Sequence, residues 1–414
     1  MTLLDDARLA DTLLADAGAL TDDLTELRHR LHRHPELGLH LPVTQRQVLE
    51  SLDGLGLEVS TGTSCTSVTA VLRGSAESTD PANPHRRVVL LRGDMDALPV
   101  TEDAEVPFRS QVDGAMHACG HDLHTAMLVG AARVLAARCG ELPGDVVFMF
   151  QPGEEGYDGA GHMIAEGVLD AAGRRADEAF ALHVLSNLAP RGMVVSRSGP
   201  LMAASDGLNV TVRGRGGHGS TPHVSADPIP AACEMVLALQ TAMTRSLDAF
   251  APSVLTVGTI HGGTQRNIIP DTVTFEATVR SFDAAVSAVI KEVTTRTCRG
   301  VAAAHGVEVD VDYTTDYPVT VNDGGAVDLG LSAAGALFGE PATFRLPNPI
   351  MGSEDFSRVI QQVPGAMLFL GALTDGRDPM SAPSNHSPLA AFDDRTLPAG
   401  VALYATVAAR SLRR

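Results

Sequence analysis

Three short apolar segments, each leading into acidic or histidine residues, constrain the fold of this 414-residue chain most strongly. They lie at residues 87–92, 145–150 and 178–184, and the stretches between them, 126–137 and 161–170, have helical patterns. Apolar strands that alternate with helices predict a parallel sheet covered on both faces. In such sheets the working side chains follow the carboxyl ends of the strands, so we expect a functional site there.

A different order of elements follows between about residues 205 and 313. Strands are predicted at residues 207–213, 253–260, 272–280 and 307–313, and helices at residues 227–244 and 283–305. This order, βαββαβ, is that of a ferredoxin-like unit. We therefore expect an α/β protein whose mostly parallel mixed sheet is flanked by helices, with an inserted ferredoxin-like domain. The predicted boundaries are residues 1–186 and 314–414 for the first domain and residues 187–313 for the insertion.

The chain is strongly acidic, with 31 Lys and Arg residues against 50 Asp and Glu residues and a formal net charge of −19. Such a surface repels phosphate backbones and anionic lipids, which argues against nucleic-acid and membrane partners. No apolar run approaches the roughly 18 residues of a membrane-spanning helix, and the first residues lack the basic start of a signal peptide. Five scattered cysteines indicate free thiols in a reducing compartment. We therefore expect a cytoplasmic protein.

Two local features near the N-terminus are also interpretable. A helix is expected at residues 21–34, because its leucines follow helical spacing after good N-cap residues. The spacing of His29, His32 and His34 does not place all three on one helix face, so we expect them to be surface residues. The Pro- and Ser-rich stretch 75–85 is predicted to be a surface loop.

The densest group of candidate metal ligands is the segment His117–His124, of sequence HACGHDLH. Cys119 and His121, two residues apart, can present two donor atoms to one ion if the segment is extended. A structural zinc knuckle would need a second pair of Cys or His ligands, which this spacing does not offer. An alternative reading makes Cys119 a nucleophile with His124 as its base.

Two acidic pairs follow the first two apolar segments. Glu154 and Glu155 are adjacent and point in opposite directions along extended backbone, so one can bind metal while the other serves as a general base. A solvated acidic loop is the alternative for this pair. Asp94 and Asp96 lie on the same side of an extended segment, and a turn after the strand is the alternative for them.

Nine motifs occur in an order that resembles a known enzyme family. They are GDMDALP (93–99), MHACGHDLHT (116–125), FQPGEEG (150–156), ALHV (181–184), GRGGHGSTPH (214–223), NIIPD (267–271), ATVRSF (277–282), MGSEDF (351–356) and NHSP (385–388). The chain resembles the aminoacylase/carboxypeptidase family of metallopeptidases, peptidase family M20, from about residue 27 to residue 400. More narrowly, it is similar to the subfamily D amidohydrolases, which include hippurate hydrolases, N-acyl-amino-acid deacylases and plant auxin-conjugate hydrolases. The resemblance implies a zinc-peptidase-like catalytic domain and an inserted lid and dimerisation domain.

The resemblance also implies a two-metal site. The implied ligands, with the Cys119 thiolate as the bridge, are Cys119, His121, Glu155, His183 and His386. By the same resemblance Glu154 is the general base, and Asp96 fixes a ligand imidazole. Asp94 occupies the place where other branches of the family carry a ligand histidine, and His124 is expected close to the ligands.

Substrate contacts are implied in the insertion and after it. His218, in a glycine-rich turn, is expected to cross a dimer interface and stabilise an oxyanion in the partner's cleft. Asn267 and Arg280 match residues that grip the substrate's carbonyl and carboxylate, and Glu354 is expected to line the site. The alternatives are a loop cap for His218, a strand-edge residue for Arg280 and a helix start for Glu354. Many relatives have GHAA where this chain has GHGS at residues 217–220, so the residues that line the substrate side next to His218 differ from those of these relatives.

The implied activity is metal-dependent hydrolysis of N-acyl-L-amino acids by an activated water. Two divalent ions per chain are implied, and Zn²⁺, Mn²⁺, Co²⁺ and Ni²⁺ all suit these ligand types. The expected partners are a small-molecule substrate and a second copy of the chain in a homodimer. A dipeptidase or aminoacyl carboxypeptidase of the same family is the alternative activity. A non-catalytic metal-binding protein is a remote alternative, because every expected position is filled.

Overall fold

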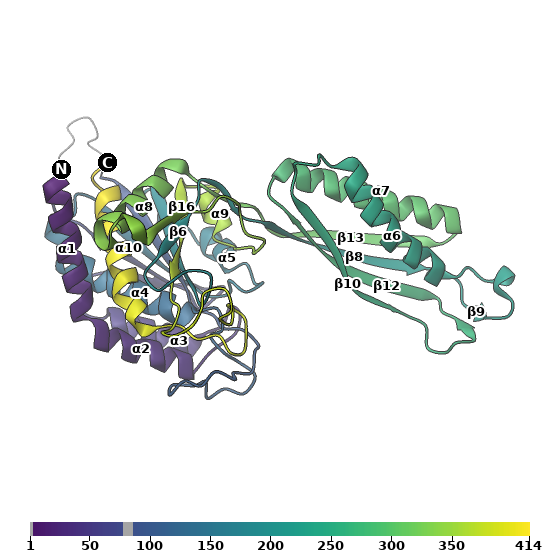
Figure 1. Cartoon of the computed structure of the whole chain (residues 1–414), viewed down its shortest axis with the longest axis horizontal. Helices are drawn as coiled ribbons and strands as arrows, with labels where there is room; N and C mark the ends of the chain where they lie inside the picture. The colour runs from purple at the N-terminus through teal and green to yellow at the C-terminus, as the bar shows by residue number, and fades with distance from the viewer. Residues whose placement is uncertain (1–2, 78–85) are drawn as a thin grey trace. The chain divides into compact units, whose positions relative to one another are not determined.

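The structure, a computed structural model, describes residues 3–77 and 86–414 as two compact units (Figure 1). The first unit contains the chain up to Gly199 together with Val321–Asn348 and Asp355–Arg414. The second unit contains Pro200–Thr320 and Pro349–Glu354. Most of the loop predicted at residues 75–85, namely residues 78–85, lies outside the described residues.

The insertion predicted at residues 187–313 has other boundaries in the structure. Before it leaves the first unit, the chain forms β6 (Val194–Ser196), which pairs with β16 (Gly365–Gly371) of the same unit. At the other end, β13 (Glu308–Tyr317) continues past residue 313 as part of the second unit's sheet. Pairing between distant strands decides where each unit ends, and the local sequence pattern does not show that pairing.

An eight-stranded sheet forms the centre of the first unit, in the order β1–β2–β4–β3–β5–β16–β6–β15. The strands not yet given are β1 (Glu58–Thr61), β2 (Val68–Arg73), β3 (Val88–Asp94), β4 (Asp145–Gln151), β5 (Glu178–Leu185) and β15 (Thr343–Arg345). The pairs β3–β4, β3–β5, β5–β16 and β6–β15 are parallel, whereas β1–β2, β2–β4 and β6–β16 are antiparallel. The predicted mostly parallel mixed sheet is therefore confirmed.

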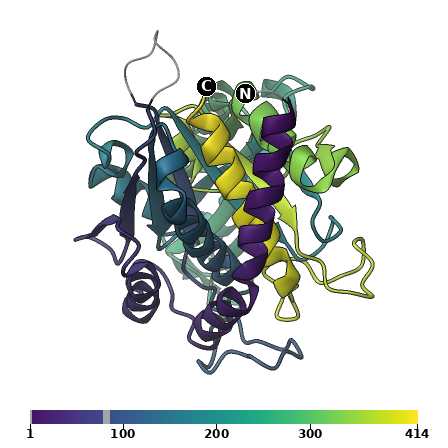
Figure 2. The same cartoon turned by 90° about the vertical axis from the view of Figure 1, so that its left-hand side faces the viewer.

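Helices cover this sheet, and their burial explains the long apolar runs. They are α1 (Leu3–Ala19), α2 (Thr21–Arg33), α3 (Pro42–Leu52), α4 (His121–Ala137), α5 (Gly159–Ala165), α8 (Gly324–Phe338), α9 (Ser357–Ile360) and α10 (Leu397–Ser411). Figure 2 shows α1 and α10, which contact each other, side by side. The helix predicted at 126–137 begins earlier, at His121. Among the described residues, no helix combines the length and the apolarity that crossing a membrane requires.

The expectation that His29, His32 and His34 are surface residues is wrong for His32, whereas His34 is exposed and His29 is partly exposed. His32 is buried, with Nδ1 2.8 Å from Oδ2 of Asp122 and Nε2 3.2 Å from Oε1 of Glu102. Arg28, also buried, donates from Nε to the same Asp122 oxygen at 2.9 Å. The buried Asp122 carboxylate of α4 needs charged partners, and α2 supplies them because the two helices pack together. Helical spacing alone does not reveal a polar contact between two helices.

The second unit has the predicted ferredoxin-like order. Along the chain it contains β8 (Ala204–Arg213), α6 (Pro228–Ser246), β10 (Ser253–Gly262), β12 (Thr272–Ser281), α7 (Ala284–His305) and β13. The strands form one antiparallel sheet in the order β10–β12–β8–β13. Alternate residues of β8, namely Leu208, Val210 and Val212, are buried in the core that α6 and α7 share with the sheet. This period of two explains why a strand, and not a helix, forms there.

Four further short strands occur among the described residues. In the second unit, β9 (Gly217–His218) pairs with β11 (Ile268–Ile269), and Figure 1 shows β9 beyond one end of the four-stranded sheet. The other two, β7 (Gly199–Met202) and β14 (Thr320–Asn322), pair with each other.

Candidate metal centre

Three neighbouring strands of the first unit deliver the candidate ligands. β3 ends at Asp94, and Asp96 follows it directly. Glu154 and Glu155 come shortly after the end of β4, and His183 lies near the end of β5. Because β3, β4 and β5 are parallel neighbours, their carboxyl ends share one edge of the sheet.

A glycine turn brings the start of α4 to the same edge. Gly120 precedes α4 with a φ of 91°, a left-handed conformation that glycine adopts without strain. A Cβ at this position would lie 2.4 Å from Cγ2 of Val184 and 3.1 Å from Cε1 of Phe392. The turn and the close approach to β5 therefore both require glycine between Cys119 and His121.

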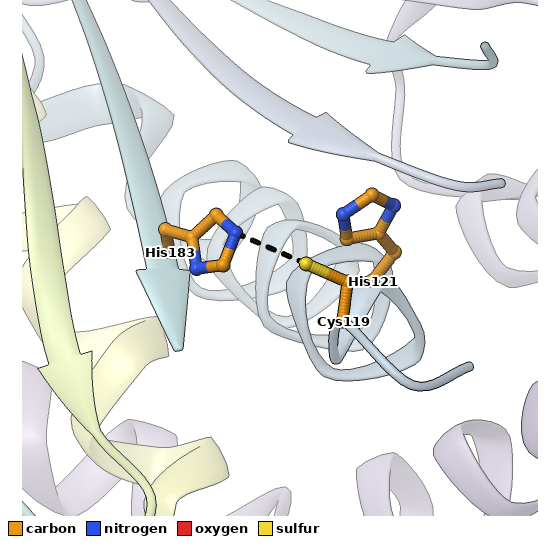
Figure 3. A group of neighbouring side chains, drawn as sticks. All are labelled: Cys119, His121 and His183. Carbon is orange, nitrogen blue, oxygen red and sulfur yellow. Dashed lines mark hydrogen bonds between the residues drawn. The ribbon is translucent and has the colours of Figure 1, made fainter. Parts of the chain in front are cut away.

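The Cys119 thiol lies between imidazole rings (Figure 3). Its Sγ is 3.4 Å from Nε2 of His183 and 3.2 Å from Nε2 of His386. The same His386 nitrogen lies 3.2 Å from Oε1 of Glu155. Nδ1 of His183 donates to the carbonyl oxygen of Val184 at 2.9 Å, so the Nε2 lone pair of His183 faces the thiol. The four side chains form one compact donor set.

Protonation within this set follows from the contacts. Hydrogen bonds to Cys119 and Glu155 raise the pKa of His386 to about 10. Burial, in contrast, lowers the pKa of His183 well below its ordinary value. A metal ion binds the deprotonated forms of such groups, so its binding displaces the proton of His386. His386 also has a φ of 70°, and strained non-glycine backbone of this kind occurs at ligand sites.

His121 shows most directly that the donor set fits a metal ion. It is buried, and within the described part of the chain neither of its ring nitrogens has a hydrogen-bond partner. Nδ1 lies 3.4 Å from Oδ1 of Asp96, and Nε2 lies 3.5 Å from Oδ2 of Asp94 and 3.9 Å from Oε1 of Glu155. A buried polar group without a partner calls for a bound ion or ligand. Thiolate, imidazole and carboxylate donors suit divalent transition metals.

Asp96 aligns the two glutamates. Its Oδ1 accepts a hydrogen bond from the backbone N–H of Glu154, and its Oδ2 accepts one from the N–H of Glu155, each at 3.0 Å. Since Asp96 also lies beside Nδ1 of His121, it connects the loop after β4 to the start of α4. The geometry agrees with a supporting role for Asp96 and leaves the carboxylates of Glu154 and Glu155 in the cluster.

Asp94 and His124 form a hydrogen-bonded pair next to the candidate ligands. Asp94 accepts hydrogen bonds from Nη1 of Arg92 at 2.6 Å and from Nδ1 of His124 at 2.5 Å. Burial opposes the charge of Asp94, but Arg92 and the two neighbouring histidines hold its pKa well below the usual range. Nε2 of His124 accepts from the backbone N–H of Val184 at 2.8 Å. Both nitrogens of His124 are thus engaged, so it has no free site to bind metal or to activate the Cys119 thiol.

His218 and Asn267 lie together in the second unit. His218 pairs with Ile268 across β9 and β11, and the N–H of Gly219 donates to the carbonyl oxygen of Asn267 at 2.9 Å. Nδ1 of His218 accepts from the N–H of Ser220 at 3.1 Å, so a neutral ring carries its proton on Nε2. The His218 side chain is exposed and able to donate from that nitrogen.

Arg280 lies on β12 of the four-stranded sheet, toward the end of that strand away from β9 and β11. β12 runs from Thr272, close to the His218 turn, to Arg280 near its other end, where Arg280 pairs with Ser205. At about 3.3 Å per residue this places roughly 26 Å between Thr272 and Arg280. Glu354 is buried at the end of the second unit's short second segment. The expected alternative, a helix that begins at Glu354, is wrong, because α9 begins only at Ser357.

One residue beside the cluster was not singled out from the sequence. The side-chain amide of Asn385 donates to the carbonyl oxygens of Cys119 and Val184, both at 3.0 Å. Its Oδ1 accepts from the backbone N–H of Ser186 at 3.0 Å. Asn385 therefore holds the loop that carries His386 against both α4 and β5. The only sequence signal was its place in the NHSP motif.

Comparison with known proteins agrees with this geometry. A family model described as peptidase family M20/M25/M40 matches residues 90–410. The chain is 35% identical over 404 residues to a Saccharolobus solfataricus protein named thermostable carboxypeptidase 2, which covers 97% of this chain and 98% of that protein. It is also 35% identical to an Arabidopsis thaliana protein named IAA-amino acid hydrolase ILR1-like 4, over 96% of this chain and 88% of that protein.

A solved structure extends the likeness to the fold. A Bacillus subtilis protein, described as a dinuclear metal binding peptidase of the M20 family, superimposes with a TM-score of 0.79 at 30% identity. The match covers 95% of this chain and 99% of that chain. The two metals are described for that relative, and in this chain the side chains around Cys119 and His121 form candidate metal-ligand groups.

Replacing the central thiol is expected to weaken metal binding. Cys119→Ser exchanges a thiolate for a hydroxyl that stays protonated, so metal affinity is expected to fall by about tenfold or more. Metal content after dialysis against a graded chelator series measures the change. Cys233→Ser alters an exposed cysteine of the second unit and is the matched control. Equal metal content in Cys119→Ser and Cys233→Ser would remove Cys119 from the ligand set.

Crowding at the glycine turn is expected to cost stability. Gly114 and Gly120 both have positive φ, but a Cβ on Gly114 meets nothing within 4 Å. Gly114→Ala is therefore expected to lose about 1 kcal/mol from backbone strain, and Gly120→Ala a further 1–3 kcal/mol or so from overpacking. Urea unfolding of the two variants measures the difference. Equal losses would mean that the space beside Val184 does not constrain the turn.

Proposed function

Because this chain belongs to the M20 family of metallopeptidases, we propose that it hydrolyses the amide bond of N-acyl-L-amino acids. The products are a carboxylic acid and a free amino acid. The observation that carries the proposal is the donor set of Cys119, His121, Glu155, His183 and His386, with Glu154 fixed at its side. Relatives of this family hydrolyse amides or peptides, as their names state, and the donor set supplies the metal dependence.

Cys119, His121, Glu155, His183 and His386 would hold the two proposed divalent ions. When bound, such ions polarise the scissile carbonyl and make an attacking water more acidic. Zn²⁺, Mn²⁺, Co²⁺ and Ni²⁺ all accept mixed sulfur, nitrogen and oxygen ligands. His121, Glu155 and Cys119 must be deprotonated at the ligating atom, which links metal loading to pH.

Glu154 is proposed as the general base. Its carboxylate lies in the same cluster as His121 and Glu155, with ligand atoms within 4.8 Å of one another. Asp96 fixes the backbone of Glu154, so the side chain approaches a substrate from a defined direction. From there Glu154 takes a proton from the attacking water and passes it to the nitrogen of the leaving amino acid. A general base needs this fixed placement more than it needs a metal contact.

The second unit is proposed to bind and polarise the substrate. Nε2–H of His218 is a hydrogen-bond donor for the oxyanion that forms on the scissile carbonyl. Asn267, beside it, is suited to the same carbonyl through its amide. Arg280 has one Nη occupied by Thr278 and Val279, and its planar fork is suited to a substrate carboxylate. Glu354 is proposed to line the same substrate site.

A homodimer would reconcile the distances within the second unit. His218 and Asn267 lie near one end of its sheet, and Arg280 lies near the other, too far apart for one small substrate. We infer that His218 and Asn267 of one protomer complete the site of its partner. The edge strand β10 and the helix α6 are the proposed contact surface, because Val254, Ile260 and Leu237 are exposed there. Pairing two copies would cover this edge and these apolar side chains.

A carboxypeptidase or dipeptidase is the second candidate activity. It is favoured by the relatives named carboxypeptidases, which are as similar to this chain as the IAA-amino acid hydrolase is. The two activities differ in the group on the substrate nitrogen, an acyl group or an aminoacyl group with a free amine. We also propose a reducing compartment, the cytoplasm, because all five cysteines are unpaired.

A substrate panel tests the proposal directly. Amine release from N-acetyl, N-benzoyl and N-indoleacetyl amino acids is compared with release from dipeptides that carry the same C-terminal residue. Each reaction contains Mn²⁺, Co²⁺ or Zn²⁺, with a chelated control. Chelator-sensitive release that is faster from acyl amino acids supports the proposal. Faster release from dipeptides would establish the second candidate instead.

Substitutions of the two adjacent glutamates are expected to affect different properties, kcat in one case and metal content in the other. Glu154→Gln removes the base but no proposed ligand, so it is expected to keep its metal while kcat falls by about 10²-fold or more. Glu155→Gln removes a proposed ligand and is expected to lose metal. Metal content and kcat are measured for both variants, with the exposed Glu276→Gln as control. Full turnover by Glu154→Gln would refute its assignment as the base.

Mixing two inactive variants tests the shared site. His218→Ala and Glu154→Gln are each expected to be nearly inactive alone. After the subunits exchange, about half of the dimers are mixed, and each mixed dimer keeps one complete site, so about a quarter of wild-type activity is expected. Sedimentation confirms the dimer in the same samples. If the mixture stays as inactive as its parts, His218 does not act on the partner's site.

A further inference from the structure

The strands β3 and β5 stop pairing before either strand ends. Their parallel register runs from Val89 opposite Glu178 to Arg92 opposite Ala181. β3 nevertheless continues to Asp94 along β4, and β5 continues along β16 to Leu185. The two strands therefore part at the edge of the sheet where the candidate metal ligands gather.

The side chain of a tyrosine bridges the two strands at the first position where they no longer pair. Tyr404, from α10, is buried, and its hydroxyl donates to the carbonyl oxygen of Arg92 at 2.6 Å. The same hydroxyl accepts from the backbone N–H of Leu182 at 2.9 Å. One phenol oxygen thus takes the place of a direct hydrogen bond between the two strands.

The side chain of a histidine links the two strands at the next position. His124, from α4, accepts from the N–H of Val184 with Nε2 and donates to the Asp94 carboxylate with Nδ1. The approach of α4 is close, because a Cβ on Gly93 would lie 3.0 Å from the carbonyl oxygen of His124. Thr125 adds a hydroxyl bond to the carbonyl oxygen of Asp94 at 2.9 Å. These contacts anchor His124 to β3 while it holds the backbone of β5.

We propose that Tyr404 and His124 are positioning residues that keep the carboxyl ends of β3 and β5 apart at the spacing the metal ions need. The inference rests on the proposed metal site. The β3 end holds Asp94 beside Nε2 of His121, and the β5 end carries His183. The ring centroids of these two histidines lie 6.2 Å apart. The width of the gap therefore sets the distance between these two histidine donors of the cluster.

The physical reason is that buried backbone groups must be paired. Without the Tyr404 hydroxyl and the His124 nitrogen, the N–H groups of Leu182 and Val184 would be buried without an acceptor. The nearest way to pair them is to continue the ladder between β3 and β5, with strands about 4.8 Å apart. That closure would pull His183 towards β3 and distort the donor set. The two side chains prevent this closure because they accept hydrogen bonds from the same backbone N–H groups while the two strands stay farther apart.

Single substitutions of Tyr404 and His124 separate positioning from general stability. Tyr404→Phe removes only the hydroxyl. His124→Gln places an amide oxygen near the position of Nε2 and can still accept from Val184, whereas His124→Asn cannot reach it. Tyr313→Phe is the matched control, because its hydroxyl also donates to a buried acceptor, Asp206, at 2.8 Å but lies in the second unit.

Metal binding is the main readout. Titration of the stripped proteins with Co²⁺ reports two affinities and an absorption spectrum that depends on ligand geometry. Tyr404→Phe and His124→Asn are expected to bind one ion about tenfold or more weakly, with a shifted spectrum. His124→Gln is expected to recover most of the affinity, and Tyr313→Phe to bind both ions as the wild type does. Hydrogen exchange of the metal-free proteins is expected to differ from the wild type at Leu182 in Tyr404→Phe and at Val184 in His124→Asn, because each substitution removes the acceptor of that N–H.

The outcomes separate this inference from the proposed function. Wild-type affinities and spectrum in Tyr404→Phe, or an equal loss in Tyr313→Phe, would overturn the positioning role. Circular dichroism and thermal unfolding identify a variant that has not folded, and the His124→Gln and His124→Asn pair then decides the question. A wild-type protein that binds two ions but hydrolyses no N-acyl amino acid refutes only the proposed substrate. A wild-type protein that binds no ion refutes the inference as well.

Discussion

A buried arginine organises the edge of the sheet on which the rest of the first unit depends. The guanidinium of Arg92 donates to Asp94 at 2.6 Å, to Gln151 at 2.8 Å and to Asp355 at 3.0 Å. These partners come from β3, from β4 and from the segment before α9. Replacing Arg92 by an uncharged residue would take its positive charge from two buried carboxylates, Asp94 and Asp355, and the loss of a buried ion-pair partner costs about 3–5 kcal/mol. Asp94, held in this way, fixes His124 and through it the end of β5.

The candidate chemistry is divided between two units with separate cores. The donor set and Glu154 belong to the first unit, whose core joins the central sheet to α1, α4 and α10. His218, Asn267 and Arg280 belong to the second, whose core lies between its sheet and α6 and α7.

Local pattern predicted the elements better than it predicted their contacts. The apolar runs that became β3, β4 and β5 and the βαββαβ order were visible because periodicity is a local property. The burial of His32 was not visible, because it depends on Asp122 of another helix. Likewise, Asn385 lies far along the chain from Cys119 and Val184, whose carbonyl groups it binds. Of the candidate site, the ligand types and their motifs were predictable, and the supporting hydrogen bonds were not.

The sequence by itself determined the two kinds of domain and the family, because strand and helix periods and ordered motifs survive without knowledge of packing. Only the tertiary structure decided which buried polar groups have hydrogen-bond partners and which have none. Both ring nitrogens of His124 make hydrogen bonds, one with Asp94 and one with the backbone N–H of Val184. His121, in contrast, is buried without a hydrogen-bond partner among the described residues. The reason is that hydrogen bonding of buried groups is set by neighbours distant in the chain, so chemically similar histidines acquire opposite roles only when the chain has folded.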